Sequence, residues 1–166
     1  LRDDLFRKYG TTMRGLQMVY HLDEEDYLSY VHDVPLRDFI RPNPELGALL
    51  ADLPYRKAIL TNADTAHAER VLNLLGIEQC FEQIIDIRAI APYCKPMPDA
   101  FSIALKLMDE RATNCAVVED SASNLITAKM LGFYTVRVGG DPACVECDAC
   151  IDSIMKLREV FAEAET

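Results

Sequence analysis

The sequence has no long apolar run, and no stretch approaches the roughly 18–20 residues that a helix needs to span a bilayer. We therefore expect no membrane-spanning segment. Basic residues are also few: 17 Lys and Arg stand against 27 Asp and Glu, which leaves a net charge of −10. Because an acidic surface repels phosphate backbones, we expect no binding of a nucleic acid polymer. A local site for a small anionic ligand is still compatible with this charge.

Internal repeats are absent as well, and half of the 166 residues are apolar. A chain of this length and composition is typical of one globular domain with room for a small additional part. The six cysteines do not resemble a disulfide scaffold, because the chain is long enough to bury a core of its own. We therefore expect a reducing, cytoplasmic environment.

Residues 1–40 have helical patterning and no convincing strand. The run of acidic residues at 23–26 suits the first turn of a helix, because negative charge is stabilised near a helix N-terminus. Pro35 is then expected to end this helix. The first part of the chain is therefore predicted to be entirely helical.

Residues 41–166 alternate short apolar runs with helical patterns. Strands are expected at 57–62, 83–87, 115–118 and, as the last one, 134–138, and helices at 45–53, 64–75, 98–108, 123–131 and 154–164. This alternation predicts an α/β fold with a Rossmann-like, doubly wound parallel sheet. Chemistry in such sheets gathers beyond the carboxyl ends of the strands.

Two sets of polar residues precede the third expected strand. Thr61 and Asn62 end the first strand, where a hydroxyl, an amide and nearby backbone N–H groups can hold a phosphate oxygen. Taken alone, this pair is more simply explained as a cap for the helix that begins near Asp64. Lys95 lies in a proline-rich loop and can balance charge between a phosphoryl group and an attacking carboxylate. A surface role explains this lysine equally well in isolation.

The third set, Glu119 and Asp120 with Ser121, directly follows an apolar strand. Adjacent acidic residues at such a place are costly unless something compensates their charge. Mg²⁺ is an economical candidate, because it takes oxygen ligands and keeps several waters. The alternative is that these residues cap the helix that follows.

The order of these three sets resembles the motif order of the haloacid dehalogenase superfamily. The resemblance lies in Ile59-Leu60-Thr61-Asn62, in the stretch from Cys94 to Phe101, and in Val117-Val118-Glu119-Asp120-Ser121. It covers about residues 41–155. Within the superfamily, the chain looks most like the pyrimidine 5′-nucleotidase-type phosphatases, on the pattern from Glu119 to Asn124.

The resemblance implies a Mg²⁺-dependent phosphomonoester hydrolase that acts on a nucleotide-like or other small phosphorylated metabolite through an aspartyl-phosphate. Thr61 would hydrogen-bond the transferring phosphoryl group, and Asn62 would assist through its backbone or side chain. Lys95 would balance the charge between nucleophile and phosphate. Asp120 would bind Mg²⁺, and Glu119 would support that site directly or through water.

The sequence departs from the family in one respect: it contains no Asp-x-Asp, the motif that carries the nucleophile and the acid/base after the first strand of family members. We expect that strand to precede Leu1, with residues 1–40 as a partial helical cap and residues 41–166 as the core. In the family the first strand lies centrally in the sheet, so its absence would leave two inner strand edges unpaired. The 166-residue chain by itself is therefore expected to fold poorly and to be inactive.

Other functions are compatible with the same residues. A phosphomutase would share all of them, and a catalytically inactive binding or scaffold protein would keep the fold. A dehalogenase fits less well, because the acidic pair has no purpose there. A metal site is a further alternative, on a Cys-x₂-Cys-x₂-Cys run formed by Cys144, Cys147 and Cys150. A cysteine-rich surface loop is the simpler explanation of that run.

Overall fold

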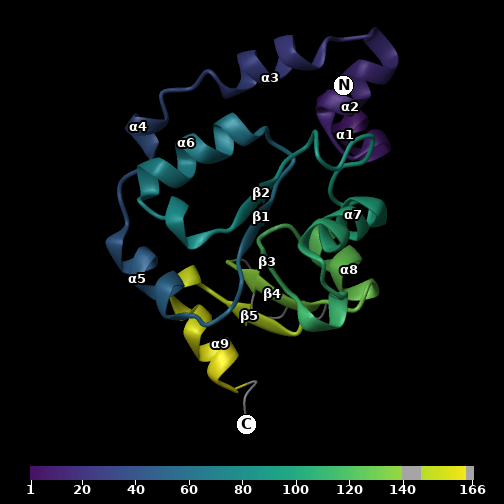
Figure 1. Ribbon diagram of the computed structural model, residues 1–166. Helices are drawn as coiled ribbons and strands as arrows, with labels where there is room; N and C mark the ends of the chain where they lie inside the picture. The colour runs from purple at the N-terminus through teal and green to yellow at the C-terminus, as the bar shows by residue number, and fades with distance from the viewer. Residues whose placement is uncertain (140–146, 164–166) are drawn as a thin grey trace.

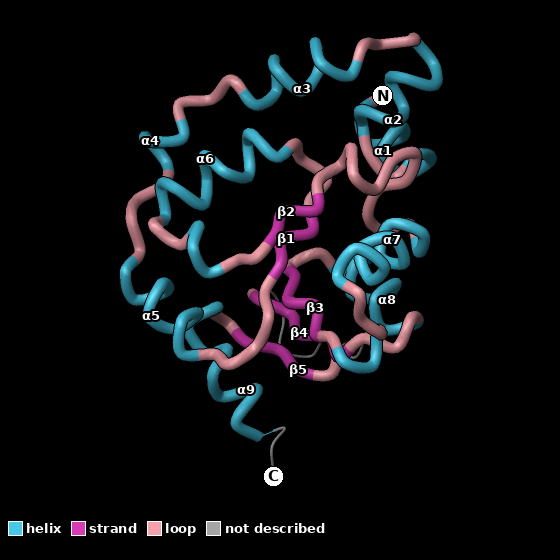
Figure 2. Tube along the Cα trace, in the orientation of Figure 1, coloured by secondary structure: helices cyan, strands magenta, loops and turns pink. Residues whose placement is uncertain are grey.

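Short helices and short strands alternate after an all-helical first part in the computed structural model, which describes residues 1–139 and 147–163 (Figures 1 and 2). The helices are α1 (Arg2–Tyr9), α2 (Thr12–Tyr20), α3 (Glu24–His32), α4 (Leu36–Phe39), α5 (Pro44–Asp52), α6 (Thr65–Leu75), α7 (Pro98–Met108), α8 (Ala122–Met130) and α9 (Leu157–Glu163). The strands are β1 (Ala58–Leu60), β2 (Gln83–Ile85), β3 (Ala116–Glu119), β4 (Tyr134–Val138) and β5 (Ala149–Ile151). None of the helices in these ranges is long and apolar enough to cross a membrane.

The strands form two separate parallel sheets. One contains β1 and β2, and the other has the order β3-β4-β5. Leu60 lies opposite Ile85 in the first sheet, and Glu119 lies opposite Arg137 in the second. Within the described residues, β1 and β3 each pair with one strand and not with each other. The α/β prediction with parallel strands is confirmed, and the two unpaired edges agree with the expectation for a sheet that lacks its central strand.

Helices cover both sides of the strands (Figure 1). α5, α6 and α9 build one apolar cluster with the sheets, in which Leu49, Leu72 and Val160 are buried. α7 and α8 build another, around Phe101 and Phe133, whose rings meet nearly edge to face at a centroid distance of 6.0 Å. Burial of such side chains contributes about 1.5–3 kcal/mol each, which explains how strands of three to five residues are held in place.

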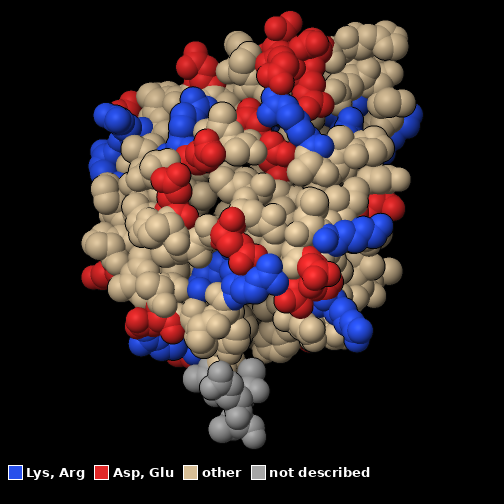
Figure 3. All heavy atoms as spheres, viewed as in Figure 1, with Lys and Arg blue, Asp and Glu red and all other residues tan. Residues whose placement is uncertain are grey.

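The helices α1–α4 run over one end of this arrangement (Figure 1), and Figure 3 shows acidic side chains gathered over α3. Met13 and Leu28 bury themselves in the same cluster as Ile87, which follows β2. The turn between α1 and α2 closely approaches the loop between β2 and α7, because a Cβ on Gly10 would lie 2.9 Å from the Sγ atom of Cys94 in that loop. The first 40 residues therefore pack against the segment that carries Lys95.

Most of the predicted elements are confirmed, because local signals specify their ends. The side chain of Asn43 accepts a hydrogen bond from the backbone N–H of Leu46 at 3.0 Å and so caps α5. Gly76 ends α6 with a φ of 75°, a left-handed conformation that favours glycine. The prediction that 134–138 is the last strand is wrong, since β5 follows. Three residues without a β-branched run are too weak a signal, and pairing with β4 defines this strand.

Candidate active site

Lys95 and Glu119 meet in a close ion pair. Lys95 lies in the loop between β2 and α7, and Glu119 is the last residue of β3, so the pair joins segments from the two sheets. The Nζ atom of Lys95 donates to Oε2 of Glu119 at 2.7 Å, and the two side chains are only 15% and 13% exposed. Because both side chains are largely shielded from solvent, salt screens this contact less than it screens a surface salt bridge.

The carboxylate of Glu119 has several further donors. Asn124 donates its Nδ2–H to Oε2 at 2.9 Å, and the backbone N–H groups of Asp120 and Ser121 donate to Oε1 at 3.1 and 3.3 Å. Burial by itself would raise the pKa of Glu119, but the interactions with Asp120, Lys95 and Asn124 outweigh it and lower the pKa to about 2. Glu119 is therefore ionised throughout the neutral range.

Asp120 is exposed next to this anion, and its pKa is raised, mainly by its interaction with the Glu119 carboxyl and by partial burial. The two adjacent carboxyl groups offer hard oxygen ligands of the kind that Mg²⁺ takes in ones and twos while keeping several waters. Within residues 1–139 and 147–163, no group of three or more His, Cys, Asp or Glu residues could hold a metal ion. The donor set thus fits Mg²⁺ completed by water and substrate oxygens, and not a closed protein cage.

Asn62 and Thr61 lie at the carboxyl end of β1, as predicted. The Asn62 side chain binds the backbone of Lys95 in both directions: Nδ2–H donates to the carbonyl at 2.9 Å, and Oδ1 accepts from the N–H at 2.8 Å. The backbone N–H of Thr61 donates to the carbonyl of Ile85 and so continues the hydrogen-bond ladder between β1 and β2. The Oγ1 atom of Thr61 accepts a hydrogen bond from the N–H of Ala63 at 3.0 Å. A continuous set of contacts therefore links Asn62 to Lys95 and Lys95 to Glu119.

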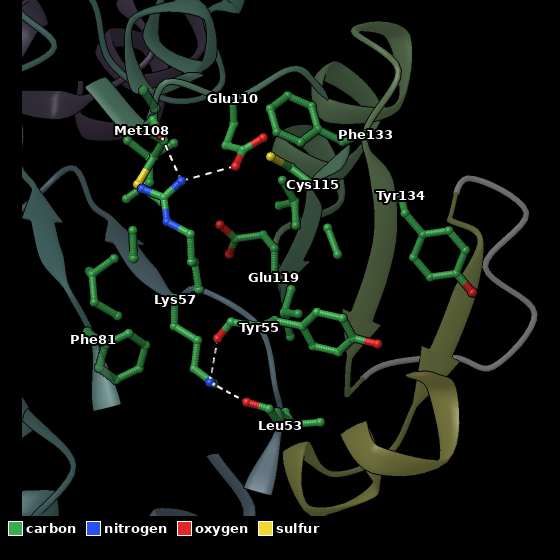
Figure 4. A pocket seen from close by; sticks show the side chains of 18 of the residues that line it. Leu53, Tyr55, Lys57, Phe81, Met108, Glu110, Cys115, Glu119, Phe133 and Tyr134 are labelled. Atoms are coloured by element: carbon green, nitrogen blue, oxygen red, sulfur yellow. Dashed lines mark hydrogen bonds and ion pairs between the residues drawn. The ribbon is translucent and has the colours of Figure 1, made fainter. Parts of the chain in front are cut away.

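A cavity of about 910 Å³ opens between the unpaired edges of β1 and β3. Ile59 and Leu60 line it from β1, and Val117 and Glu119 from β3, with Lys95 also at its wall. Figure 4 shows Glu119 drawn among the lining residues, together with side chains such as those of Cys115 and Phe133. The cavity is thus mostly apolar and has the ion pair in its wall.

A second polar cluster was not predicted from the sequence. His32 at the end of α3 contacts Asp64 through Nδ1 and Oδ2 at 2.9 Å and stacks on His67 with ring centroids 4.1 Å apart. Asp64 is buried and also caps α6 by accepting from the N–H of His67 at 2.6 Å. The sequence could indicate only that Asp64 caps α6, because the cap and the capped residue are three residues apart. The contact with His32 had no local signal, because His32 is 32 residues away from Asp64 in the chain. The cluster ties α3 to the beginning of α6.

The cysteine run that suggested a metal site is only partly described. Cys144 lies outside the described residues, whereas Cys147 lies two residues before β5 and Cys150 is the middle residue of that strand. The predicted surface loop contains a strand at this point, as noted above.

A sequence profile described as haloacid dehalogenase-like hydrolase matches residues 6–132. The chain belongs to this family. It is 34% identical over 130 residues to a plasmid-encoded phosphoglycolate phosphatase of Cupriavidus necator, covering 74% of this chain and 56% of that protein. It is 28% identical over 148 residues to the phosphate metabolism protein 8 of Saccharomyces cerevisiae, covering 80% of this chain and 46% of that protein. The chain therefore spans about half the length of these curated relatives.

The L-2-haloacid dehalogenase of Xanthobacter autotrophicus has the same fold, with a TM-score of 0.67, 17% identity, and coverage of 91% of this chain and 74% of that one. The predicted membership of the haloacid dehalogenase superfamily is confirmed. These relatives do not single out the pyrimidine 5′-nucleotidases within it.

Proposed function

We propose that the whole protein is a Mg²⁺-dependent phosphomonoester hydrolase that acts on a small phosphorylated metabolite through an aspartyl-phosphate. The observation that carries this proposal is the Lys95–Glu119 pair, which meets at the wall of the cavity between the open edges of β1 and β3. Family membership supports the same class of reaction. The net charge of −10 does not oppose it, because the site contains its own cation.

Each residue of the site has a role in this proposal. Lys95 balances charge on the phosphoryl group, and the Asn62 side chain holds the Lys95 backbone in position. Thr61 donates its hydroxyl to a phosphoryl oxygen. Asp120 and Glu119 would hold Mg²⁺, which when bound neutralises charge on the transferring group. The helices α1–α4 would form part of a cap over this end of the core.

The nucleophile is proposed to lie on a further strand. The 166 residues contain no Asp-x-Asp, and the cavity separates two parallel strands whose free edges face it. An apolar strand seated there would pair with both edges, and a carboxylate at its end would lie on the same side of the sheet as Lys95 and Glu119. We accordingly propose that residues 1–166 alone hydrolyse no phosphate ester.

Two observations point to different substrates within the class of small phosphomonoesters. The Glu119-to-Asn124 pattern favours a nucleoside 5′-monophosphate, whereas the relative in Cupriavidus necator is named a phosphoglycolate phosphatase. Both compounds are small phosphomonoesters, so the proposal holds for either. A phosphomutase or a catalytically inactive binding protein is the competing function, because each would keep the same residues.

The deciding experiment begins with the coding sequence upstream of Leu1. We expect it to encode an Asp-x-Asp after a strand, and we expect protein extended by this segment to release phosphate when Mg²⁺ is present. The panel should contain phosphoglycolate, a hexose monophosphate and nucleoside 5′-monophosphates. An extended protein that binds these esters without releasing phosphate would be a binding protein, and one that moves the phosphoryl group within a sugar would be a mutase.

A further inference from the structure

Two cysteines face each other at β5, away from the proposed phosphate site. The Sγ atoms of Cys147 and Cys150 lie 2.6 Å apart. This separation is close to the roughly 2.05 Å of a disulfide bond, so little movement is needed to join them. Both residues are partly exposed, so a small molecule in solution can reach them.

The backbone that carries this pair is held firmly. Asp148, between the two cysteines, accepts hydrogen bonds from the N–H and hydroxyl of Thr135 at 2.8 and 2.7 Å. Lys129 contacts the same carboxylate at 3.0 Å, and Thr135 is fully buried. Cys150 itself lies in β5 opposite Arg137 of β4. Because a strand and a buried threonine fix the backbone on which they sit, the two thiols are positioned in advance for reaction with each other.

The contact between their two sulfur atoms distinguishes Cys147 and Cys150 from the other described cysteines. Cys94 is fully buried, and burial raises the pKa of its thiol. Burial likewise raises the pKa of Cys115. Because the thiolate is the reacting form, a raised pKa and low access make a cysteine inert. Contact between two cysteine sulfurs occurs only at Cys147 and Cys150 among the hydrogen-bonded contacts of the described residues.

We propose that Cys147 and Cys150 are a redox-active dithiol that forms a reversible intramolecular disulfide by exchange with a low-molecular-weight disulfide such as oxidised glutathione. The thiolate of one cysteine attacks a glutathione sulfur, forms a mixed disulfide and releases one glutathione. The thiolate of the other attacks the protein sulfur of that mixed disulfide and releases the second glutathione. The protein loses two protons and two electrons, which convert one oxidised glutathione into two reduced molecules.

The disulfide would form on the same sheet as Glu119. Glu119, Arg137 and Cys150 lie opposite one another in successive strands, so they form one row across β3, β4 and β5. Neighbouring strands are about 4.8 Å apart, which places the dithiol two strands from the end of β3. The pair is therefore a modification site on the same sheet as Glu119 but two strands away from it, outside the proposed active site, and it stands independently of the proposed phosphatase activity.

The test uses the full-length protein with Cys144→Ser, so that one Cys-x₂-Cys pair remains. The protein is equilibrated in mixtures of reduced and oxidised glutathione, quenched with acid, alkylated, digested with trypsin and weighed by mass spectrometry. In the oxidising mixtures, we expect the tryptic peptide of residues 138–156 to be lighter by two hydrogens and to carry no alkyl groups, and we expect reduction to reverse both changes. In the added background of Cys147→Ser, we expect a glutathione adduct on Cys150 instead. Peptides that stay fully alkylated at every mixture would overturn the proposal.

A second measurement tests whether the fold, and not only the short spacing of the two cysteines in the sequence, favours disulfide formation. The same titration in concentrated urea reports the pair in the unfolded chain. We expect the native protein to oxidise at about tenfold lower oxidised glutathione than the unfolded chain, because the fold holds the two thiols together. Equal midpoints would show that the structure does not favour the pair. In the protein with all cysteines intact, a bond from Cys144 to either partner would also contradict it.

Discussion

The side-chain amide of Asn62 forms two hydrogen bonds with the backbone of Lys95, one to the carbonyl and one from the N–H. This contact joins the carboxyl end of β1 to the loop after β2, across 33 residues of chain. The loop therefore keeps its position relative to the strand, and the Lys95 ammonium reaches Glu119 from a fixed base. Asn62 acts here through its contact with the loop.

Asn62→Ala is expected to destabilise the protein by about 1–3 kcal/mol, because it leaves two partly buried backbone groups without their partners. Asn62→Asp keeps the acceptor but turns a carboxylate oxygen toward the Lys95 carbonyl oxygen, so its cost should be at least as large. The measurement is urea unfolding. Asn73→Ala is the matched control, since its Nδ2–H reaches the carbonyl of Glu69 on an exposed helix surface, and it should change stability by no more than about 0.5 kcal/mol. Equal effects at the two positions would contradict the role of Asn62.

Lys95→Met is expected to reduce phosphate release by the extended, active protein by about 10²-fold or more, because it removes the cation that balances charge at the site. The substitution also leaves the Glu119 carboxylate without its ion-pair partner, so some loss of stability should accompany it. Lys106→Met, on the exposed side of α7, is the matched control and should leave the rate unchanged. A Lys95→Met protein with normal turnover would remove Lys95 from the proposed chemistry.

Acidification is expected to destabilise the folded protein between pH 7.5 and 5.5, in part through His67. Burial, followed by the nearby charges of His32 and Arg70, lowers the pKa of His67 below its ordinary value of 6.5, while Asp64 opposes this. The unfolded chain therefore binds a proton first as the pH falls through 6.5, so stability is full above that pH and decreases below it. The pKa of Asp64 is itself lowered, so that carboxyl stays ionised in this window.

The measurement is urea unfolding across that pH range for the wild type and His67→Gln. Gln cannot take up a proton, so the variant should lose part of the pH slope. His21→Asn is the control, because His21 is exposed, and it should keep the wild-type slope. Identical slopes for His67→Gln and the wild type would show that His67 does not contribute.

Gly10→Ala is expected to cost more than Gly76→Ala, although both glycines have positive φ values, of 84° and 75°. The left-handed conformation costs an alanine about 1–2 kcal/mol at either position. At Gly10 the new Cβ would also lie 2.9 Å from the buried Sγ of Cys94, whereas nothing lies within 4 Å at Gly76. Thermal unfolding should show this difference, and Cys94→Ala should reduce the added cost of Gly10→Ala. Equal costs at the two glycines would show that α1 and the Cys94 loop are not in close contact.

Much of the fold could be predicted because its elements carry local signals. Asn43 before Pro44 and Gly76 after Leu75 mark helix ends through groups within a few residues. β5 could not be predicted in this way, since its three residues become a strand only by pairing with β4. The same division holds in the site. The order of Thr61, Lys95 and Glu119 indicated the family. The contacts of Asn62 with Lys95 and of His32 with Asp64 could not be predicted, because their partners are 33 and 32 residues apart in the chain.

The amino-acid sequence by itself determined the alternation of helices and strands, the ends of most helices and the superfamily, because hydrophobic period, caps and motif order all act over short stretches. Only the tertiary structure decided which polar groups meet. It paired Lys95 with Glu119, opened the cavity between β1 and β3, and brought Cys147 against Cys150 on a strand fixed by Thr135. These contacts depend on how distant segments pack, and packing is settled by the whole core and not by any one segment.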